Sequence, residues 1–470
     1  MPIPAVLLTA VSTAGGGQVA LVVGAGCSFE APTSLPLAGK CSTDAHRRLV
    51  DNGVLSEGEC TEPWNLSQLA DIIKAKNNGD QEALVNCLPH REFKNATANE
   101  GHLIAAVLLL EGAITNIVTL NYDLALSDAI SRIGVQDEIA VINGPEQHSQ
   151  LGGKNLIYLH RSVDNDFEDW ILTTDALESE WKDAWEETIA RHAISAPVTV
   201  FAGMGSSCGV INHSADKLRR AVGETAQMIL ANPGDIADSA FAKELAISGD
   251  NYVRLGWIDF MREIGTRYHK EVVSLLQNKI EEIVNREGYL DADGKSTEDI
   301  PALLKRIEEL GILKFGSFRG ALLLDHRQFP KLESGHFYAI ADLLLGIGCI
   351  ERHGSVEGVF QQDGHVTFRN ETQQEVSVFL VDGSTRNLRW LSVENQIRQY
   401  EDVMSINYRR KSRRIVAAGL SGTRPEQATP PISIVGGTGA DNILDGEAPF
   451  QYWDVQQLRE EVASIDRLLA

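Results

Sequence analysis

The sequence has few cationic side chains for its length, and this shortage excludes one broad class of function. Its 470 residues include 42 Lys and Arg against 65 Asp and Glu, which gives a formal net charge of -23. A general nucleic-acid binder needs a local excess of positive charge to neutralise phosphates. We therefore do not expect nucleic acid to be a partner.

Cysteine is scarce as well. The chain has 6 cysteines, and no two of them form a CxxC pair. A secreted disulfide scaffold is denser in cysteine, and a zinc ribbon needs paired cysteine spacings. These two absences favour reduced thiols in a cytoplasmic protein, and we expect no metal.

Long hydrophobic runs are missing too. No stretch of about 18 uncharged apolar residues occurs, so the sequence predicts no membrane-spanning helix. Residues 1–14 are apolar but lack the basic segment of a signal peptide. We expect them to form a first helix packed against a sheet.

What the first half does contain is a series of short apolar segments with β-branched residues, which is typical of buried parallel strands. These predicted strands are residues 19–23, 117–120, 140–142, 156–159, 198–202 and 228–230, and polar or glycine residues follow each one. In a doubly wound sheet, ligands bind outside the carboxyl ends of the strands. The pattern predicts a Rossmann-like parallel α/β sheet with a site at that edge.

The first of these strands runs into a glycine loop, Gly24-Ala25-Gly26-Cys27-Ser28. Two glycines after a buried strand let the backbone turn tightly, and the N-terminus of a following helix can hold a pyrophosphate. A dinucleotide fingerprint requires a third glycine where this chain has Phe29. The loop is therefore not that of an ordinary dehydrogenase, and taken alone it is also compatible with a simple strand–helix turn.

Two further strands end in candidate catalytic side chains. Asn121 and Asp123 follow the second strand, where they could hold ribose hydroxyls or a water, or merely cap the next helix. His160 follows the fourth strand, where it could act as a base or could be a structural histidine. Each residue taken alone is ambiguous.

The ordered set is more specific. The segments GAG-x-S, T-x-N-Y-D and L-H, in that order, resemble the sirtuin family, and especially its prokaryotic NADase branch. Residues 28–40 (SFEAPTSLPLAGK), 171–175 (ILTTD) and 201–206 (FAGMGS) are similar to further segments of that family, as is the asparagine Asn232. The resemblance covers roughly residues 19–235, about half of the chain.

The resemblance implies a sirtuin-like NAD-binding fold with NAD+ as a substrate. It implies that Asn121, His160 and Asp123 are catalytic. The implied nucleotide-binding residues are Gly24, Ala25, Gly26, Ser28, Gly203, Ser206 and Asn232, of which Ser206 and Asn232 are on the adenosine side.

Two departures from the family pattern bear on the reaction. Arg161 stands where the family usually has glycine, and the paired zinc cysteines of the deacylases are missing. Both favour hydrolysis of the nicotinamide–ribose bond over protein deacylation. A non-catalytic nucleotide sensor is the main alternative, favoured by Arg161, and a deacylase is the weaker one.

The second half differs in character, so we predict two domains, residues 1–250 and 251–470. Residues 257–286 and 300–313 have helical periodicity, and residues 376–381 and 388–393 suggest a β-hairpin. The basic run at residues 409–414 could bind a phosphate or an acidic partner, or form a solvated helix face.

Free NAD hydrolysis would be toxic to the host. Relatives implied by the resemblance are held inactive until a trigger arrives, often viral infection. We accordingly expect a C-terminal α+β domain for oligomerisation, a regulatory protein from the same operon or a nucleotide trigger, and a role in anti-phage defence by abortive infection.

Overall fold

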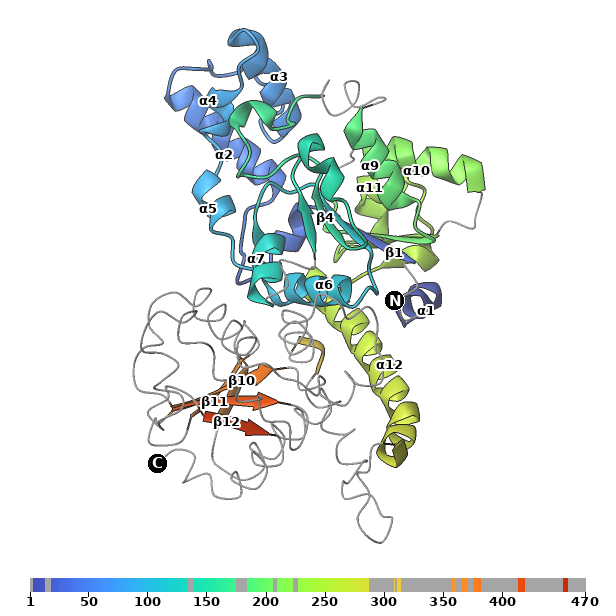
Figure 1. Ribbon diagram of the computed structural model, residues 1–470. Coiled ribbons are helices and arrows are strands. Elements are labelled where there is room, and N and C mark those ends of the chain that lie inside the picture. Colours follow the sequence, from blue (N-terminus) through green and yellow to red (C-terminus); the bar gives the residue numbers. More distant parts are fainter. Residues whose placement is uncertain are drawn as a thin grey trace. The chain divides into compact units, whose positions relative to one another are not determined.

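The computed structural model describes residues 3–12, 18–133, 139–174, 184–205, 209–222 and 227–286, together with residues 308 and 311–313 and five short strands between 357 and 454 (Figure 1). The chain folds into two compact units. The first comprises Met1–Ser131 and Gln136–Tyr268, and the second comprises Arg132–Val135 and His269–Ala470.

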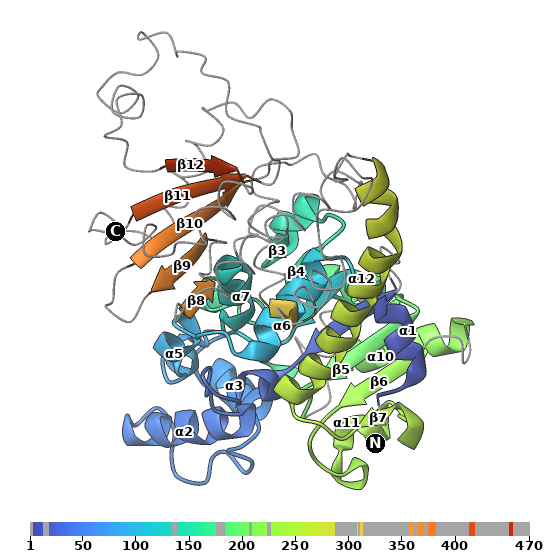
Figure 2. The same cartoon turned by 90° about the horizontal axis from the view of Figure 1, so that it is seen from below.

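The first unit is built on a parallel sheet of seven strands in the order β3-β4-β2-β1-β5-β6-β7 (Figures 1 and 2). The strands are β1 (Val19–Val23), β2 (Asn116–Thr119), β3 (Ala140–Ile142), β4 (Asn155–Tyr158), β5 (Val198–Ala202), β6 (Gln227–Ala231) and β7 (Tyr252–Val253). The predicted Rossmann-like parallel sheet is confirmed, and each predicted strand lies within one residue of its observed limits.

Strand β1 lies at the centre of the sheet, and every one of its residues is buried. A continuous apolar run without alternation is typical of such a strand. It pairs with β2 on one side and with β5 on the other. Strands β2 to β4 lie on one side of β1, and β5 to β7 lie on the other, so the strand order switches between β1 and β5. A ligand is expected to bind at this switch point, between the loops that follow β1 and β5.

Helices cover both faces of this sheet and form an insertion between β1 and β2. They are α1 (Ala5–Ser12), α2 (Ala38–Asp51), α3 (Leu66–Lys76), α4 (Glu82–Val85), α5 (His90–Lys94), α6 (Glu100–Leu110), α7 (Ala125–Arg132), α9 (Trp185–Ile194), α10 (Gly209–Val222), α11 (Ala240–Glu244) and α12 (Trp257–Arg286). Single 3-10 turns lie at Ala25–Ser28, Pro145–Gln150, Phe167–Asp169, Ile236–Asp238 and Gly249–Asn251.

Two hydrophobic cores hold the first unit together. One core joins sheet residues such as Val22, Val118 and Phe201 to α9, including its buried residue Ile189. The other lies within helices α2 to α4 and is closed by Trp170 and other residues from the segment after β4. The helical insertion thus has a core of its own beside the sheet (Figure 1).

The helices agree with the predictions at two places and differ at one. The apolar N-terminus forms helix α1, which contacts β1 and β5, and residues 257–286 form α12 as predicted. The glycine loop, however, itself forms a single 3-10 turn at Ala25–Ser28, and the next α-helix begins only at Ala38. The helix N-terminus considered for a pyrophosphate thus does not follow the glycines directly, because Pro32 and Pro36 lie in the connecting segment and disfavour a continuous helix there.

The second unit contains a sheet of five strands in the order β12-β11-β10-β9-β8. These are β8 (Glu357–Phe360), β9 (His365–Arg369), β10 (Glu375–Val381), β11 (Arg413–Ala418) and β12 (Gln451–Asp454). Strand β10 pairs antiparallel with β9 and parallel with β11, so the sheet is mixed. Arg413 and Arg414 begin a strand, and the expectation of a helix face was wrong for these two residues.

Several predictions on the second half fall on residues that the structure does not describe, namely residues 388–393 of the hairpin, most of the helix at 300–313 and the basic residues 409–411. Among the described helices, none is both long enough and apolar enough to cross a membrane.

Candidate functional site

Three glycines bring the loops after β1 and β5 into direct backbone contact. The N–H groups of Gly24 and Gly26 donate hydrogen bonds to the carbonyls of Ala202 and Gly203, at 2.9 Å and 3.0 Å. A Cβ on Gly24 would lie 2.8 Å from the Gly203 oxygen, and one on Gly26 would lie 2.8 Å from the Gly203 Cα. Gly203 has a φ of +64°, and its own Cβ would lie 2.5 Å from the Cys27 nitrogen. The glycines are required for this close approach.

This contact changes how the glycine loop can serve a ligand. The sequence suggested that its free N–H groups cradle a pyrophosphate, but those of Gly24, Gly26 and Cys27 donate to backbone carbonyls. The hydroxyl of Ser28 is the polar side chain that the loop contributes to the site. Cys27 is fully buried, and burial raises the pKa of its thiol.

A hydrogen-bonded network joins this loop to the end of β2. The Asn121 side-chain nitrogen donates to the carbonyl of Gly24 at 3.1 Å and lies 3.4 Å from the Ser28 hydroxyl. That hydroxyl in turn donates to Asp123 at 2.9 Å. Thr119 accepts from the backbone N–H of Asn121 at 3.1 Å, which fixes the start of the turn. Three of the predicted site residues, Ser28, Asn121 and Asp123, therefore lie together.

Asp123 has two roles in this network. One oxygen accepts from Ser28, and the other accepts from the backbone N–H of Ala125 at the start of α7. The capping role considered for this residue is thus present in addition to its contact with the loop. Burial raises the pKa of the Asp123 carboxyl, and the hydrogen bonds from Ala125 and Ser28 partly offset that effect.

His160 follows β4, the neighbour of β2 in the sheet, and is partly accessible to solvent. Desolvation lowers the pKa of its imidazole to about 4, against the opposing effect of a hydrogen bond to the backbone of Leu120. The ring centroid of His160 lies 6.1 Å from that of Tyr122. At neutral pH the imidazole is therefore uncharged, and its lowered pKa makes it a weaker base than an ordinary histidine.

Tyr122 belongs to a row of stacked rings that the sequence analysis did not foresee. Its ring lies 4.5 Å from Trp170 at an angle of 3°, and Trp170 stacks on His90 at 5.5 Å. The Tyr122 hydroxyl donates to the carbonyl of Ile171 at 2.8 Å. Position 122 lies inside the motif T-x-N-Y-D, but its ring partner is 48 residues away and no local pattern links the two.

Arg161, next to the candidate base, adopts a backbone conformation that glycine favours. Its φ is +74°, in the left-handed region. Its guanidinium pairs with Glu186 of α9 at 2.7 Å, and the exposed fractions of the two side chains are 12% and 8%. The guanidinium also lies 5.7 Å from the ring centroid of Trp185.

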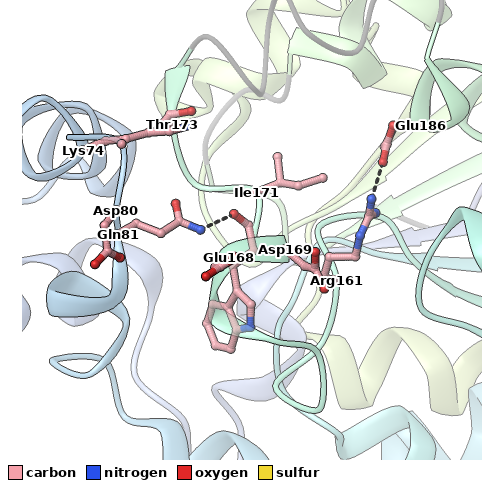
Figure 3. A pocket seen from close by; sticks show the side chains of 11 residues that line it. Lys74, Asp80, Gln81, Arg161, Glu168, Asp169, Ile171, Thr173 and Glu186 are labelled. Atoms are coloured by element: carbon pink, nitrogen blue, oxygen red, sulfur yellow. Dashed lines mark hydrogen bonds and ion pairs between the residues drawn. The ribbon is translucent and has the colours of Figure 1, made fainter. Parts of the chain in front are cut away.

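Arg161 and Glu186 line a cavity of about 530 Å³ (Figure 3). One wall comes from the insertion, through Lys74, Asp80 and Gln81, and another comes from the segment after β4, residues 168–171 and 173. Gln81 holds the walls together, since its amide donates to the carbonyls of Phe167 and Trp170 at 2.7 Å and 2.8 Å. One guanidinium nitrogen of Arg161, Nη1, is buried and has no hydrogen-bond partner among the residues that the structure describes.

Two further predicted residues, Gly203 and Asn232, follow β5 and β6 on the other side of β1. Gly203 touches the glycine loop, as described above. The Asn232 side chain, after β6, donates to the carbonyl of Met204 at 3.4 Å and accepts from the N–H of Gly234 at 3.0 Å. Ser206 lies outside the described residues. Within the described part of the chain, no group of three or more His, Cys, Asp or Glu side chains is arranged to hold a metal ion.

Fold and site together define an α/β protein with a polar site at the carboxyl edge of a parallel sheet. Residues 115–249 match the family model of the SIR2-like domain. This segment contains Asn121, Asp123 and His160, on which the resemblance to sirtuins partly rests. No curated protein matches the chain.

Solved structures of Sir2 homologues are also similar to this chain. A mutant Sir2 homologue in complex with ADP-ribose is 15% identical, with 57% of this chain and 98% of that chain covered and a TM-score of 0.34. A complex of a Sir2 homologue with NAD is 16% identical, with 57% and 94% covered and a TM-score of 0.33.

Proposed function

We propose that this protein is an NAD+ hydrolase that cleaves the bond between nicotinamide and ribose. The observation that carries the proposal is the network of Ser28, Asn121 and Asp123 at the carboxyl end of β2, which pairs with β4, the strand that His160 follows. The SIR2-like match over residues 115–249 supports the same interpretation.

The reaction requires little acid catalysis, because nicotinamide leaves as a neutral base from a cationic pyridinium. The carbon–nitrogen bond breaks and its electron pair stays on nicotinamide. A water oxygen then bonds to the ribose carbon, and the water loses a proton. In the proposed mechanism Asn121 orients the water and the ribose, and His160 accepts the proton.

The nucleotide is held by both sides of the crevice. Ser28, Gly24, Ala25 and Gly26 lie on the pyrophosphate side, with Asp123 fixing the Ser28 hydroxyl. Ser206 and Asn232 are assigned to the adenosine side, and Gly203 is assigned to the nucleotide site where it contacts the glycine loop. Because Gly24 and Gly26 use their N–H groups on β5 and the loop after it, their contribution is to shape the glycine loop.

The activity would deplete the host cell of NAD+, so we propose that it is regulated. Residues 251–470 are assigned to oligomerisation, to a partner protein or to a nucleotide trigger, and abortive infection against phage is the proposed setting. The proposed location is the cytoplasm.

The decisive experiment incubates the purified full chain with NAD+, with and without candidate triggers, and measures free nicotinamide. We expect release by the wild type and its loss in Asn121→Ala, because the water and the ribose are no longer oriented. The matched control is Asn95→Ala, which removes only an exposed hydrogen bond to the Arg91 carbonyl at the end of α5.

The other outcomes identify the alternatives. Binding of ADP-ribose without release of nicotinamide under any condition would indicate a nucleotide sensor. Release only when an acylated peptide is added would indicate a deacylase. Equal activity of Asn121→Ala and the wild type would exclude the assigned role of Asn121.

A further inference from the structure

The buried side chain of Asn99, at the N-terminal end of α6, connects the glycine loop to a distant helix. Its amide nitrogen donates to the carbonyl of Cys27 at 2.9 Å and to that of Glu30 at 3.4 Å. Its amide oxygen accepts from the backbone N–H of His102 and from the indole N–H of Trp257, both at 3.1 Å. Asn99 is fully buried, so both of its polar atoms depend on these partners.

Trp257 is the first residue of α12, and the structure accommodates its ring closely. Its exposed fraction is 4%, and a Cβ on Gly101 of α6 would lie 2.3 Å from its indole nitrogen. The next residue, Ile258, donates its N–H to the Glu30 carboxylate at 3.3 Å. The beginning of α12 is thus bound to the loop both directly and through Asn99; Figure 2 shows α12 beginning beside α6.

The loop needs such external contacts. Ala25–Ser28 is a single 3-10 turn, which is too short to be stable alone. Gly203 and Asn121 hold one side of it, and Asn99 holds the carbonyls of Cys27 and Glu30 on the other side. Ser28, whose hydroxyl reaches Asp123, lies between those two carbonyls.

We infer that Asn99 and Trp257 are positioning residues for the nucleotide-binding loop, so that the start of α12 sets the affinity for the ADP-ribose part of NAD+. Neither residue lies within the segment that matches the SIR2-like domain, and neither belongs to a glycine, asparagine or histidine motif of the site. The inference rests on the proposed function for the identity of the ligand, but its structural part concerns the loop alone.

The test compares Trp257→Phe with Tyr268→Phe in the full chain. The first variant keeps an aromatic ring and loses the donor to Asn99. The second loses a hydroxyl of the same helix that lies 3.4 Å from Glu111, at the far end of α6. One readout is amide hydrogen exchange of residues 24–30 without nucleotide, and the other is binding of ADP-ribose.

We expect faster exchange of residues 24–30 in Trp257→Phe and a dissociation constant for ADP-ribose that rises about 3- to 10-fold, the effect of one lost hydrogen bond. In turnover, KM for NAD+ should rise while kcat stays close to that of the wild type. Tyr268→Phe should resemble the wild type in all of these readouts.

Unchanged exchange and binding in Trp257→Phe would overturn the inference, and so would equal changes in both variants, which would indicate general loosening of α12. A wild type that neither binds ADP-ribose nor releases nicotinamide would instead overturn the proposed function and the ligand named here. Faster loop exchange in Trp257→Phe alone would then still support the positioning of the loop.

Discussion

At the scale of single residues, Arg161 adopts a backbone conformation that glycine favours. A positive φ at position 161 explains why glycine suits this place, since a side chain in the left-handed region costs roughly 1–2 kcal/mol. The ion pair with Glu186 offsets that cost in this protein. A tertiary contact, the ion pair with Glu186, thus accompanies a backbone conformation of Arg161 that is locally unfavourable.

Replacing Arg161 tests whether the ion pair with Glu186 outweighs the cost of the left-handed backbone conformation. Arg161→Gly should relieve the backbone but leave Glu186 buried without a partner, for a net loss of about 2 kcal/mol in the free energy of unfolding. The double variant Arg161→Gly/Glu186→Gln removes the unpaired charge and should recover most of that loss. Urea denaturation measures all three proteins, and a single variant as stable as the wild type would contradict the assigned role of the ion pair.

Three histidines, His90, His102 and His160, have lowered pKa values and should make stability depend on pH. Desolvation lowers the pKa of His102 to about 3 and that of His160 to about 4, from an ordinary value of 6.5. At a pH between the folded and the unfolded pKa of each histidine, the unfolded chain binds more protons than the folded chain. Stability should therefore fall as the pH drops below about 6.5. Thermal melts between pH 7 and pH 5 should show this slope.

Two matched variants, His102→Gln and His192→Gln, test this dependence of stability on pH. Glutamine at position 102 retains an acceptor for the N–H of Asn99, now provided by His102 Nδ1 at 3.3 Å, but cannot become charged. The slope should become shallower in His102→Gln and stay unchanged in His192→Gln, which alters an exposed residue of α9. An unaltered slope in His102→Gln would contradict the assignment.

At the scale of elements, the contact between the loops after β1 and β5 decides the geometry of the site. Backbone meets backbone there, so a methyl group cannot be accommodated by moving a flexible side chain. Hydrogen bonds from Gly24 and Gly26 make the two loops one rigid unit at the switch point of the sheet.

Gly203→Ala should therefore be costly. It forces alanine into a φ of +64° and places a Cβ 2.5 Å from the Cys27 nitrogen, so we expect a loss of about 2–4 kcal/mol in the free energy of unfolding. Gly205→Ala is the control, because no residue that the structure describes lies within 4 Å of its Cβ position, and its effect should stay within about 0.5 kcal/mol. Similar stability of the two variants would show that the loops can separate without cost.

At the scale of the whole molecule, the start of α12 belongs to the first compact unit. This unit extends past residue 250, the boundary expected from the sequence, and includes residues up to Tyr268. The reason lies in four buried apolar side chains, Trp257, Phe260, Met261 and Ile264, each no more than 4% exposed. The division into residues 1–250 and 251–470 remains a proposal, which truncation can test.

A fragment of residues 1–268 should fold, while one of residues 1–250 should not. The shorter fragment loses these four side chains and also strand β7 with the buried Tyr252 and Val253. The four side chains alone contribute roughly 6–12 kcal/mol of burial free energy, about as much as the total stability of a domain. Circular dichroism and thermal melting of the two fragments would decide the matter. Equal melting curves would place the boundary at residue 250 after all.

The sequence alone determined the parallel sheet, because buried strands are continuous apolar runs with polar residues at their ends. It also indicated Asn121, Asp123 and His160, since local motifs identify residues at strand ends. Only the tertiary structure decided what surrounds them. The pairing of Arg161 with Glu186, the stack of Tyr122 on Trp170 and the link from Asn99 to Trp257 join residues 25 to 158 positions apart. Such contacts depend on how the helices pack on the sheet, and no local pattern records them. The sequence suggested free N–H groups at the glycine loop. In the structure the N–H groups of Gly24 and Gly26 donate to carbonyls of β5 and the loop after it, and no local pattern records these partners.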